Sequence, residues 1–276
     1  MRILPFLVAS AILLTAAAPA VSPAPVVVAE RAFAKDGAAM GVGPSFLKWS
    51  EPDAVMIGPS GLTRPKEAFG GSPPTGPQPL LAWWPMWAGI AQSGDLGFTT
   101  GPVEVGGQRQ GHYFTVWRRQ AGGDWRWVYD GGTGATSAGE PPASSEPAYL
   151  PVSKAKPLAH NRAGQAVDQV EADLARAARS NLKSAFAGIL APEARMYVAP
   201  RPPAIGPDAI AQALSAYPAT LDFAPPAGGA SSKAGDLIYV FGRVKGTGVN
   251  GYYVHLWQRR PEGMKLVFAQ IIPTRG

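Results

Sequence analysis

Residues 93–130 read SGDLGFTTGPVEVGGQRQGHYFTVWRRQAGGDWRWVYD, and residues 234–270 read AGDLIYVFGRVKGTGVNGYYVHLWQRRPEGMKLVFAQ. The two stretches match: Gly-Asp-Leu at 94–96 recurs at 235–237, and Trp117 recurs as Trp257. The segments before them also align, with Phe46 opposite Phe186. The repeating unit is therefore a whole domain present twice, and not a solenoid unit of ~20–50 residues.

Each copy shows the same order of predicted elements. Residues 30–49 and 167–190 are rich in Ala and carry apolar residues at helical spacing. Gly41 and Pro44 predict a break in the first of these helices. A short strand, a short helix (64–69 and 207–217) and a meander of three strands with Gly turns follow. The sequence therefore predicts an α+β fold in which a curved antiparallel sheet packs on N-terminal helices.

The N-terminal segment MRILPFLVASAILLTAAAPA is typical of a cleavable signal peptide. Its apolar run is about a dozen residues, too short to cross a bilayer that needs ~20 helical residues, and Ala18-Pro19-Ala20 forms a small-x-small cleavage site. We expect a periplasmic or secreted protein without stable membrane insertion after cleavage; the alternative is an uncleaved N-terminal anchor. The predicted divisions are a signal peptide (1–20), an extended leader (21–28), a first domain (29–132), a linker rich in Pro, Gly, Ser and Ala (133–165) and a second domain (166–276).

Composition excludes several classes of site. The chain of 276 residues has no cysteine, which excludes disulfides and thiolate chemistry. The formal charge is +6, but the basic residues are scattered, so no nucleic-acid partner is expected. The three histidines show no metal-binding spacing, and no phosphate- or dinucleotide-binding motif occurs. We therefore expect no metal and no cofactor.

Four motifs carry a resemblance to a known family. They are Glu30-Arg31-Ala32-Phe33, Asp53-Ala54-Val55, Ser93–Gly97 and the run from Gly111 to Arg119. With the order of elements, they resemble the nuclear transport factor 2-like superfamily, which includes SnoaL-like cyclases, ketosteroid isomerase and scytalone dehydratase, and in particular its bacterial branch of domains of unknown function. The resemblance covers nearly all of residues 29–132 and, more weakly, 167–273. It implies two tandem cone-shaped domains that pair with each other through their sheets, but it says little about function.

The acid–base positions of the isomerases in this superfamily are vacant. The resemblance places their catalytic base just after the first strand, where this chain has Gly58 and Val198. The remaining catalytic candidates are His112 together with Asp53 or Tyr113. The alternative reading is that Asp53 is a turn carboxylate and His112 a strand residue without catalytic function.

An unusual cluster of aromatic residues marks the first copy. Trp83, Trp84 and Trp87 lie close together in the sequence, and His112, Tyr113 and Trp127 are expected to face the same space. We interpret these six as the wall of an apolar ligand cavity, the alternative being core packing or a dimer surface. The second copy has no Trp at the matching segment 217–223, so we expect the ligand in the first cone and a structural role for the second.

These patterns predict an exported non-enzymatic protein. Its expected role is to bind a small apolar ligand in the first cone, or to act as an interaction module. The alternative is a SnoaL-type lyase, isomerase or hydrolase that uses His112 with Asp53 or Tyr113.

Overall fold

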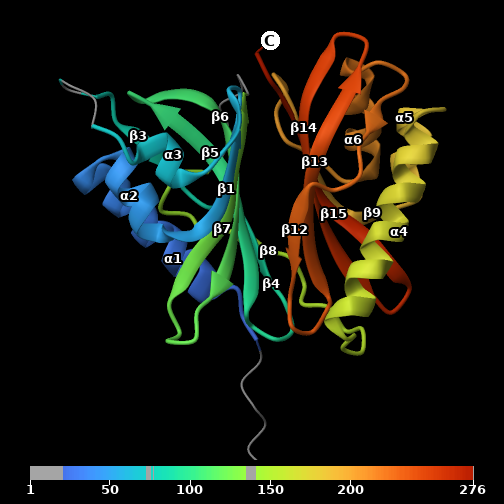
Figure 1. Cartoon of the computed structure of the whole chain (residues 1–276), viewed down its shortest axis with the longest axis horizontal. Helices are drawn as coiled ribbons and strands as arrows, with labels where there is room; N and C mark the ends of the chain where they lie inside the picture. Colours follow the sequence, from blue (N-terminus) through green and yellow to red (C-terminus); the bar gives the residue numbers. More distant parts are fainter. Residues whose placement is uncertain (1–20, 73–75, 77, 135–140, 276) are drawn as a thin grey trace, which may run out of the picture.

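The computed structural model describes residues 21–72, 76, 78–134 and 141–275, which form two halves of the same design (Figure 1). The predicted signal peptide lies outside the described residues. In each half, helices cover one face of a curved sheet. The two sheets face each other in the middle of the molecule, with the helices on the outer sides (Figure 1). The predicted fold class, α+β with two tandem cone-shaped domains, is confirmed.

Each half follows the predicted order of elements. The first half contains α1 (Ala24–Met40), α2 (Val42–Trp49), β1 (Ser50–Gly58), β2 (Gly61–Thr63), α3 (Pro65–Phe69), β3 (Leu81–Trp83), β4 (Trp87–Ile90), β5 (Leu96–Val105), β6 (Gln108–Arg119), β7 (Trp125–Gly134) and β8 (Ala148–Tyr149). The second half contains α4 (His160–Ala178), α5 (Leu182–Ala187), β9 (Leu190–Val198), β10 (Ala204–Ile205), α6 (Pro207–Ala213), the 3-10 helix η1 (Leu214–Ala216), β11 (Asp222–Phe223), β12 (Gly228–Ser231), β13 (Leu237–Gly246), β14 (Val249–Arg260) and β15 (Gly263–Pro273). Among the helices in these ranges, none combines the length and apolar character needed to cross a bilayer.

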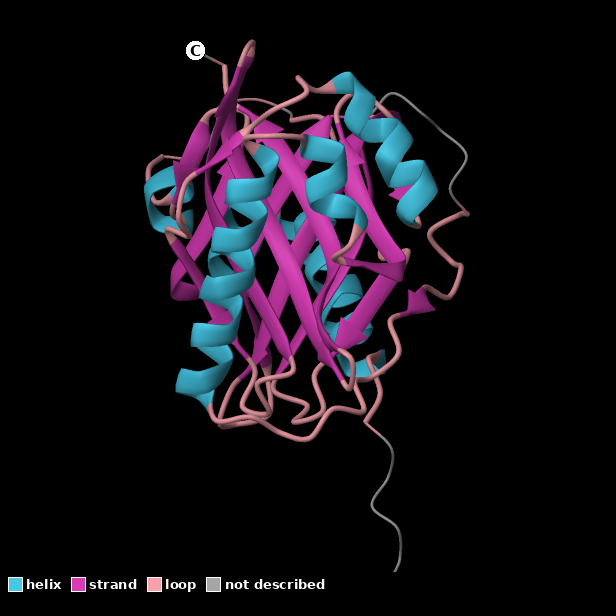
Figure 2. Cartoon of the chain, turned by 90° about the vertical axis from the view of Figure 1, so that its right-hand side faces the viewer, coloured by secondary structure: helices cyan, strands magenta, loops and turns pink. Residues whose placement is uncertain are grey.

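The two sheets share one topology. Their strand orders are β2-β1-β7-β6-β5-β4-β8 and β10-β9-β15-β14-β13-β11, and the long strands cross diagonally in the view of Figure 2. The predicted antiparallel sheet is found in each half with one exception, because β1 runs parallel to β7 and β9 runs parallel to β15. In each half the first strand is joined to its neighbour through the entire meander, and a connection of that length permits a parallel pair.

Helix α1 corrects the prediction of an extended leader over residues 21–28. The helix begins at Ala24 with Pro25 in its first turn, where proline is tolerated. Val26 and Val27 are buried, so packing overrides the modest helix propensity of consecutive valines. The predicted break between α1 and α2 is confirmed at Gly41, whose φ of 91° favours glycine.

The predicted linker over residues 133–165 is more structured than expected. Strand β7 continues to Gly134, β8 pairs with β4, and α4 already begins at His160. Leu150, directly after β8, is buried in the core. Ser153 and Ala155 are buried as well. A two-residue strand and scattered buried side chains leave no periodic pattern, so the sequence did not reveal them.

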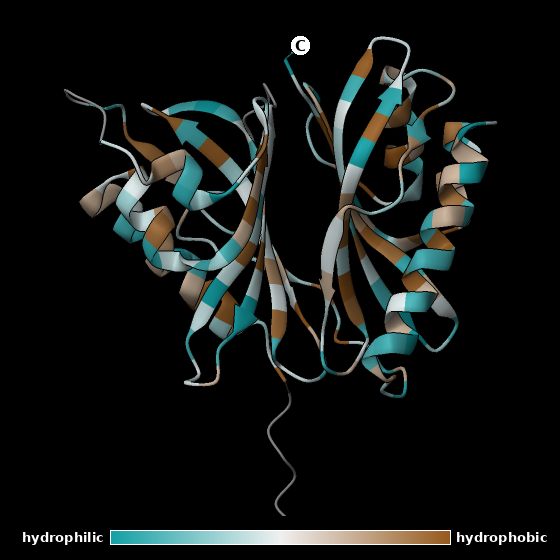
Figure 3. Cartoon of the chain, in the orientation of Figure 1, coloured by the Kyte–Doolittle hydropathy of each residue, from teal (hydrophilic) through white to brown (hydrophobic). Residues whose placement is uncertain are grey.

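Aromatic side chains join the two sheets. Phe114 of β6 stacks on Phe268 of β15 with ring centroids 4.0 Å apart and an interplanar angle of 9°. Tyr129 of β7 packs near Tyr239 and Phe241 of β13. One hydrophobic core therefore runs across both halves, and the strands of the two facing sheets carry many hydrophobic positions (Figure 3).

The repeated Gly-Asp-Leu turns form a reciprocal hydrogen-bonded clasp between the halves. The carboxylate of Asp95 accepts from the backbone N–H of Lys233 at 3.1 Å, and the carboxylate of Asp236 accepts from that of Gln92 at 2.9 Å. Each aspartate therefore binds the residue three positions before its counterpart in the other copy. Such reciprocity indicates an approximate two-fold relation between the halves.

Candidate functional site

Strand alternation places the predicted site residues of β6 on two opposite faces of the sheet. Tyr113 and Trp117 point into the first cone, towards the helices, and belong to its core. His112 and Phe114 point the other way, towards the second half, where their rings lie against Tyr197 and Phe268. Neighbouring residues of a strand always diverge in this way, so His112 and Tyr113 do not converge.

Three of the six predicted ligand-binding residues lie together inside the first cone: Trp83, Tyr113 and Trp127. Phe33 of α1 fills the centre, with its ring centroid 4.9 Å from that of Trp83. Phe46 of α2 packs edge-on against Trp127, with the two ring centroids 6.0 Å apart. These aromatic side chains are closely packed with one another and with the helices.

The other three predicted ligand-binding residues lie outside this interior. Trp87 packs against Phe98, and the guanidinium of Arg195 from the second half lies 4.6 Å from its ring. His112 faces Tyr197, as described above. Trp84 donates from Nε1 to the carbonyl oxygen of Pro141 at 3.0 Å. Asp53, the remaining catalytic candidate, is exposed at the start of β1, so the structure does not bring it to His112 or Tyr113.

The interior of the first cone holds a carboxyl group that the sequence analysis did not select. Glu30 of α1 is fully buried and accepts hydrogen bonds from Nε1 of Trp83 at 2.6 Å, from Nε1 of Trp117 at 3.0 Å and from the hydroxyl of Thr99. Burial raises the pKa of Glu30 to about 7, although the hydrogen bonds from Thr99, Trp83 and Trp117 lower it. A buried carboxyl group with such a pKa is a typical candidate for proton transfer.

The second cone contains the repeat-equivalent carboxylate. Glu171 of α4 accepts from Nε1 of Trp257, and both of its carboxylate oxygens contact Nδ1 of His255, at 2.9 and 3.1 Å. His255 is fully buried, and its Nε2 has no hydrogen-bond partner in the described part of the chain. A histidine held by a carboxylate through one nitrogen has the arrangement of a general base, and here the rings of Phe186, Phe223 and Tyr253 pack around it.

The sequence repeat could have revealed both buried carboxylates, because they occupy matching positions of the two copies. Glu30 and Glu171 are separated by the same interval as Asp95 and Asp236, and each faces the Trp that the alignment had matched, Trp117 or Trp257. Their common structural effect is to fasten the first helix of each half to its sheet. Among the described residues, no group of acidic and histidine side chains is arranged to hold a metal ion.

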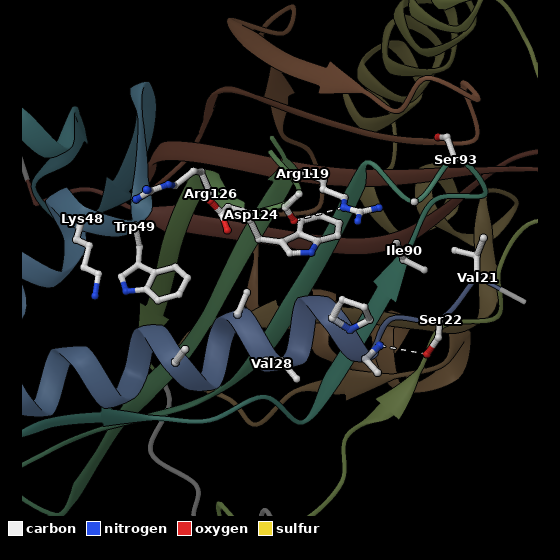
Figure 4. Close-up of a pocket in the computed structure, with 17 residues that line it drawn as sticks. Val21, Ser22, Val28, Lys48, Trp49, Ile90, Ser93, Arg119, Asp124 and Arg126 are labelled. Atoms are coloured by element: carbon white, nitrogen blue, oxygen red, sulfur yellow. Dashed lines mark hydrogen bonds between the residues drawn. The ribbon is translucent and has the colours of Figure 1, made fainter. Parts of the chain in front are cut away.

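A groove of about 1080 Å³ opens on the outer side of the first half, between α1 and the β6–β7 hairpin (Figure 4). Three of its lining residues, Ala29, Ile90 and Trp125, also belong to the core of the first cone. The exposed residue Val28 and the half-buried Trp49 form further parts of its wall. The groove therefore gives solvent access to the edge of the first cone's aromatic core.

The rim of the groove is cationic. Lys48, Arg119 and Arg126 line it, opposed by the single carboxylate of Asp124. One carboxylate oxygen of Asp36 accepts from Nζ of Lys48 at 2.7 Å and from Nε1 of Trp49 at 2.7 Å. The hydrogen bond from Lys48 has the larger effect and that from Trp49 the next, and both lower the pKa of Asp36. Asp36 therefore stays ionised and holds a cation beside an indole ring.

Comparison with known proteins reveals similarity in fold. No family model and no curated protein matches the sequence. Solved structures that match include a cystatin-like fold protein from Burkholderia xenovorans (19% identity, 42% of this chain and 94% of that chain, TM-score 0.35). An NTF2-like protein of unknown function from Pseudomonas putida matches with 13% identity, 42% of this chain and 89% of that chain (TM-score 0.35). An NTF2-like superfamily protein from Salmonella enterica matches with 14% identity, 42% of this chain and 94% of that chain (TM-score 0.35). The predicted resemblance is confirmed at the level of fold: the chain is a tandem pair of domains similar to nuclear transport factor 2-like, cystatin-fold proteins.

Proposed function

We propose that this protein is an exported ligand-binding protein that holds a small apolar molecule in the groove between α1 and the β6–β7 hairpin. The groove carries this proposal, because it is concave, adjoins the aromatic core and has room for a ligand of a few hundred daltons. Export is supported by the signal-peptide pattern of residues 1–20. The two halves act as an internal pair, which the Phe114–Phe268 stack and the reciprocal Asp clasp support.

Native mass spectrometry of the protein isolated from its own host tests the proposal. We expect a bound species of a few hundred daltons and a chain that is monomeric because its halves pair internally. Ala32 lines the groove, so the A32W variant should exclude the ligand. The matched control is A39W, which places the same side chain at an exposed position later on α1. Retention of the ligand by A32W, or its absence from both the parent protein and A39W, would contradict groove binding.

The predicted alternative, acid–base chemistry by His112 with Asp53 or Tyr113, is not favoured by the positions of these side chains. The acid–base pair that the fold does assemble is Glu171–His255. This pair supports a second candidate function, proton transfer on a small substrate in the second cone.

Access of reagents to His255 tests this second candidate. Diethyl pyrocarbonate modification, mapped by peptide mass spectrometry, should label His255 in the native protein if small molecules reach its free nitrogen. His160, which is exposed at the start of α4, is the internal reference for an accessible histidine. Labelling of His160 alone, with His255 labelled only after denaturation, would exclude catalysis there.

A further inference from the structure

We propose that the ligand of the groove is an amphipathic anion, in which an acidic group contacts the cationic rim and an apolar body lies along α1. The cationic rim is the set Lys48, Arg119 and Arg126. This inference rests on the proposed function, since it assigns a chemical class of ligand to the same site.

The charges at the groove favour an anion. Among the lining residues, three cations face one acid, Asp124. Lys48 has a carboxylate partner in Asp36, whereas the guanidinium groups of Arg119 and Arg126 have no ion pair with a carboxylate in the described part of the chain. Arginine presents several N–H donors in one plane and matches the oxygens of carboxylate, phosphate or sulfate groups.

The apolar body of the ligand has a matching surface on α1. Ala24, Val28 and Ala32 follow one another at a spacing of four residues, so they share one face of the helix, and all three line the groove. Val28 exposes 64% of its surface to solvent. An apolar chain or ring laid against this strip would remove it from water, and the indole of Trp125 forms part of the opposite wall.

Asp36 is a positioning residue for this site. Its carboxylate holds the ammonium group of Lys48 and the indole N–H of Trp49 with the same oxygen. It thereby fixes a cation and an aromatic surface side by side at the groove wall.

Isothermal titration calorimetry with three probes of equal chain length tests the ligand class: decanoate, 1-decanol and decyltrimethylammonium. We expect decanoate to bind at least ~10-fold more tightly than 1-decanol, a difference that reflects a pair of charge-assisted contacts. Raising NaCl from about 50 mM to about 500 mM should reduce this preference, because salt screens exposed charges. The combined variant K48Q/R119Q/R126Q should abolish the preference and retain decanol binding. The control K183Q, which removes an exposed lysine of α5, should leave both affinities unchanged.

The outcomes separate this inference from the proposed function. Equal binding of decanoate and decanol, both blocked by A32W, would overturn the anion inference and leave apolar binding in the groove intact. Binding of decanoate that survives A32W would place the anion elsewhere and overturn the inference as well. Failure of all three probes to bind would contradict the proposed function itself.

Discussion

The substitution E30Q makes the most direct test of the buried carboxyl group in the first cone. Glutamine has nearly the same shape as glutamate but cannot ionise. Its amide can donate to the hydroxyl oxygen of Thr99, which also lies 3.0 Å from Nε1 of Trp117 and can accept from it. The variant therefore leaves few buried polar groups unpaired, and at acidic pH we expect it to destabilise the fold by only about 1 kcal/mol.

The pH dependence of this effect follows from the pKa of Glu30. Burial raises that pKa from an ordinary value of 4.5 to about 7, so the folded chain binds the proton more tightly than the unfolded chain. The resulting stabilisation is complete below about pH 4.5 and is lost as the pH rises through about 7. The pKa difference corresponds to about 3 kcal/mol. E30Q should therefore be less stable than the parent protein by about 1 kcal/mol near pH 4, nearly equal to it near pH 5 and more stable by about 2 kcal/mol near pH 8.

Urea unfolding at a series of pH values, followed by tryptophan fluorescence, measures this difference. Seven of the eight tryptophans precede residue 130, so the signal reports mainly on the first half. The control E262Q removes an exposed carboxylate from the β14–β15 turn and should show no crossover. If the stability difference between E30Q and the parent protein stays constant from about pH 5 to about pH 8, Glu30 is ionised throughout and the reasoning fails.

Two further predictions concern packing. F114A and F268A should each lower the free energy of unfolding by about 3–5 kcal/mol. The double variant should lose clearly less stability than the sum of the two single losses, because the ring centroids lie 4.0 Å apart in one stack. If the losses measured by urea unfolding are strictly additive, this stack does not couple the halves. G101A should be strongly destabilising, because an added Cβ would lie 2.0 Å from the carbonyl oxygen of Trp84. G122A, where the added atom meets nothing within 4 Å, serves as its control, and equal melting temperatures of the two variants would refute the predicted clash.

Much of the fold could be predicted because its signals are local or repeated. The matching Gly-Asp-Leu turns and the pair Trp117 and Trp257 identified a duplicated domain. Gly41 marked the end of α1 through the backbone freedom that only glycine has. The start of α1 was missed because Val26 and Val27 favour strand as isolated residues, and only their burial makes the helix stable there.

The candidate sites were harder to predict, for a different physical reason. A glutamate in an Ala-rich helix, such as Glu30, normally marks the solvent-exposed face. It is buried here because Trp83, Trp117 and Thr99 reach it from three separate strands. The three histidines show no motif spacing in the sequence, yet tertiary packing brings His255 to Glu171.

The sequence by itself determined the duplication, the order of elements and the two alternating faces of each strand, since these depend on neighbours along the chain. Alternation requires His112 and Tyr113 to point in opposite directions, so the common cavity predicted for both was wrong, but alternation cannot state which of them enters the cone. Only the tertiary structure decided that, because the answer depends on which face the helices cover and which face meets the second half. The groove beside α1 likewise exists only in three dimensions, where a helix from the start of the first half lies against a hairpin from its end.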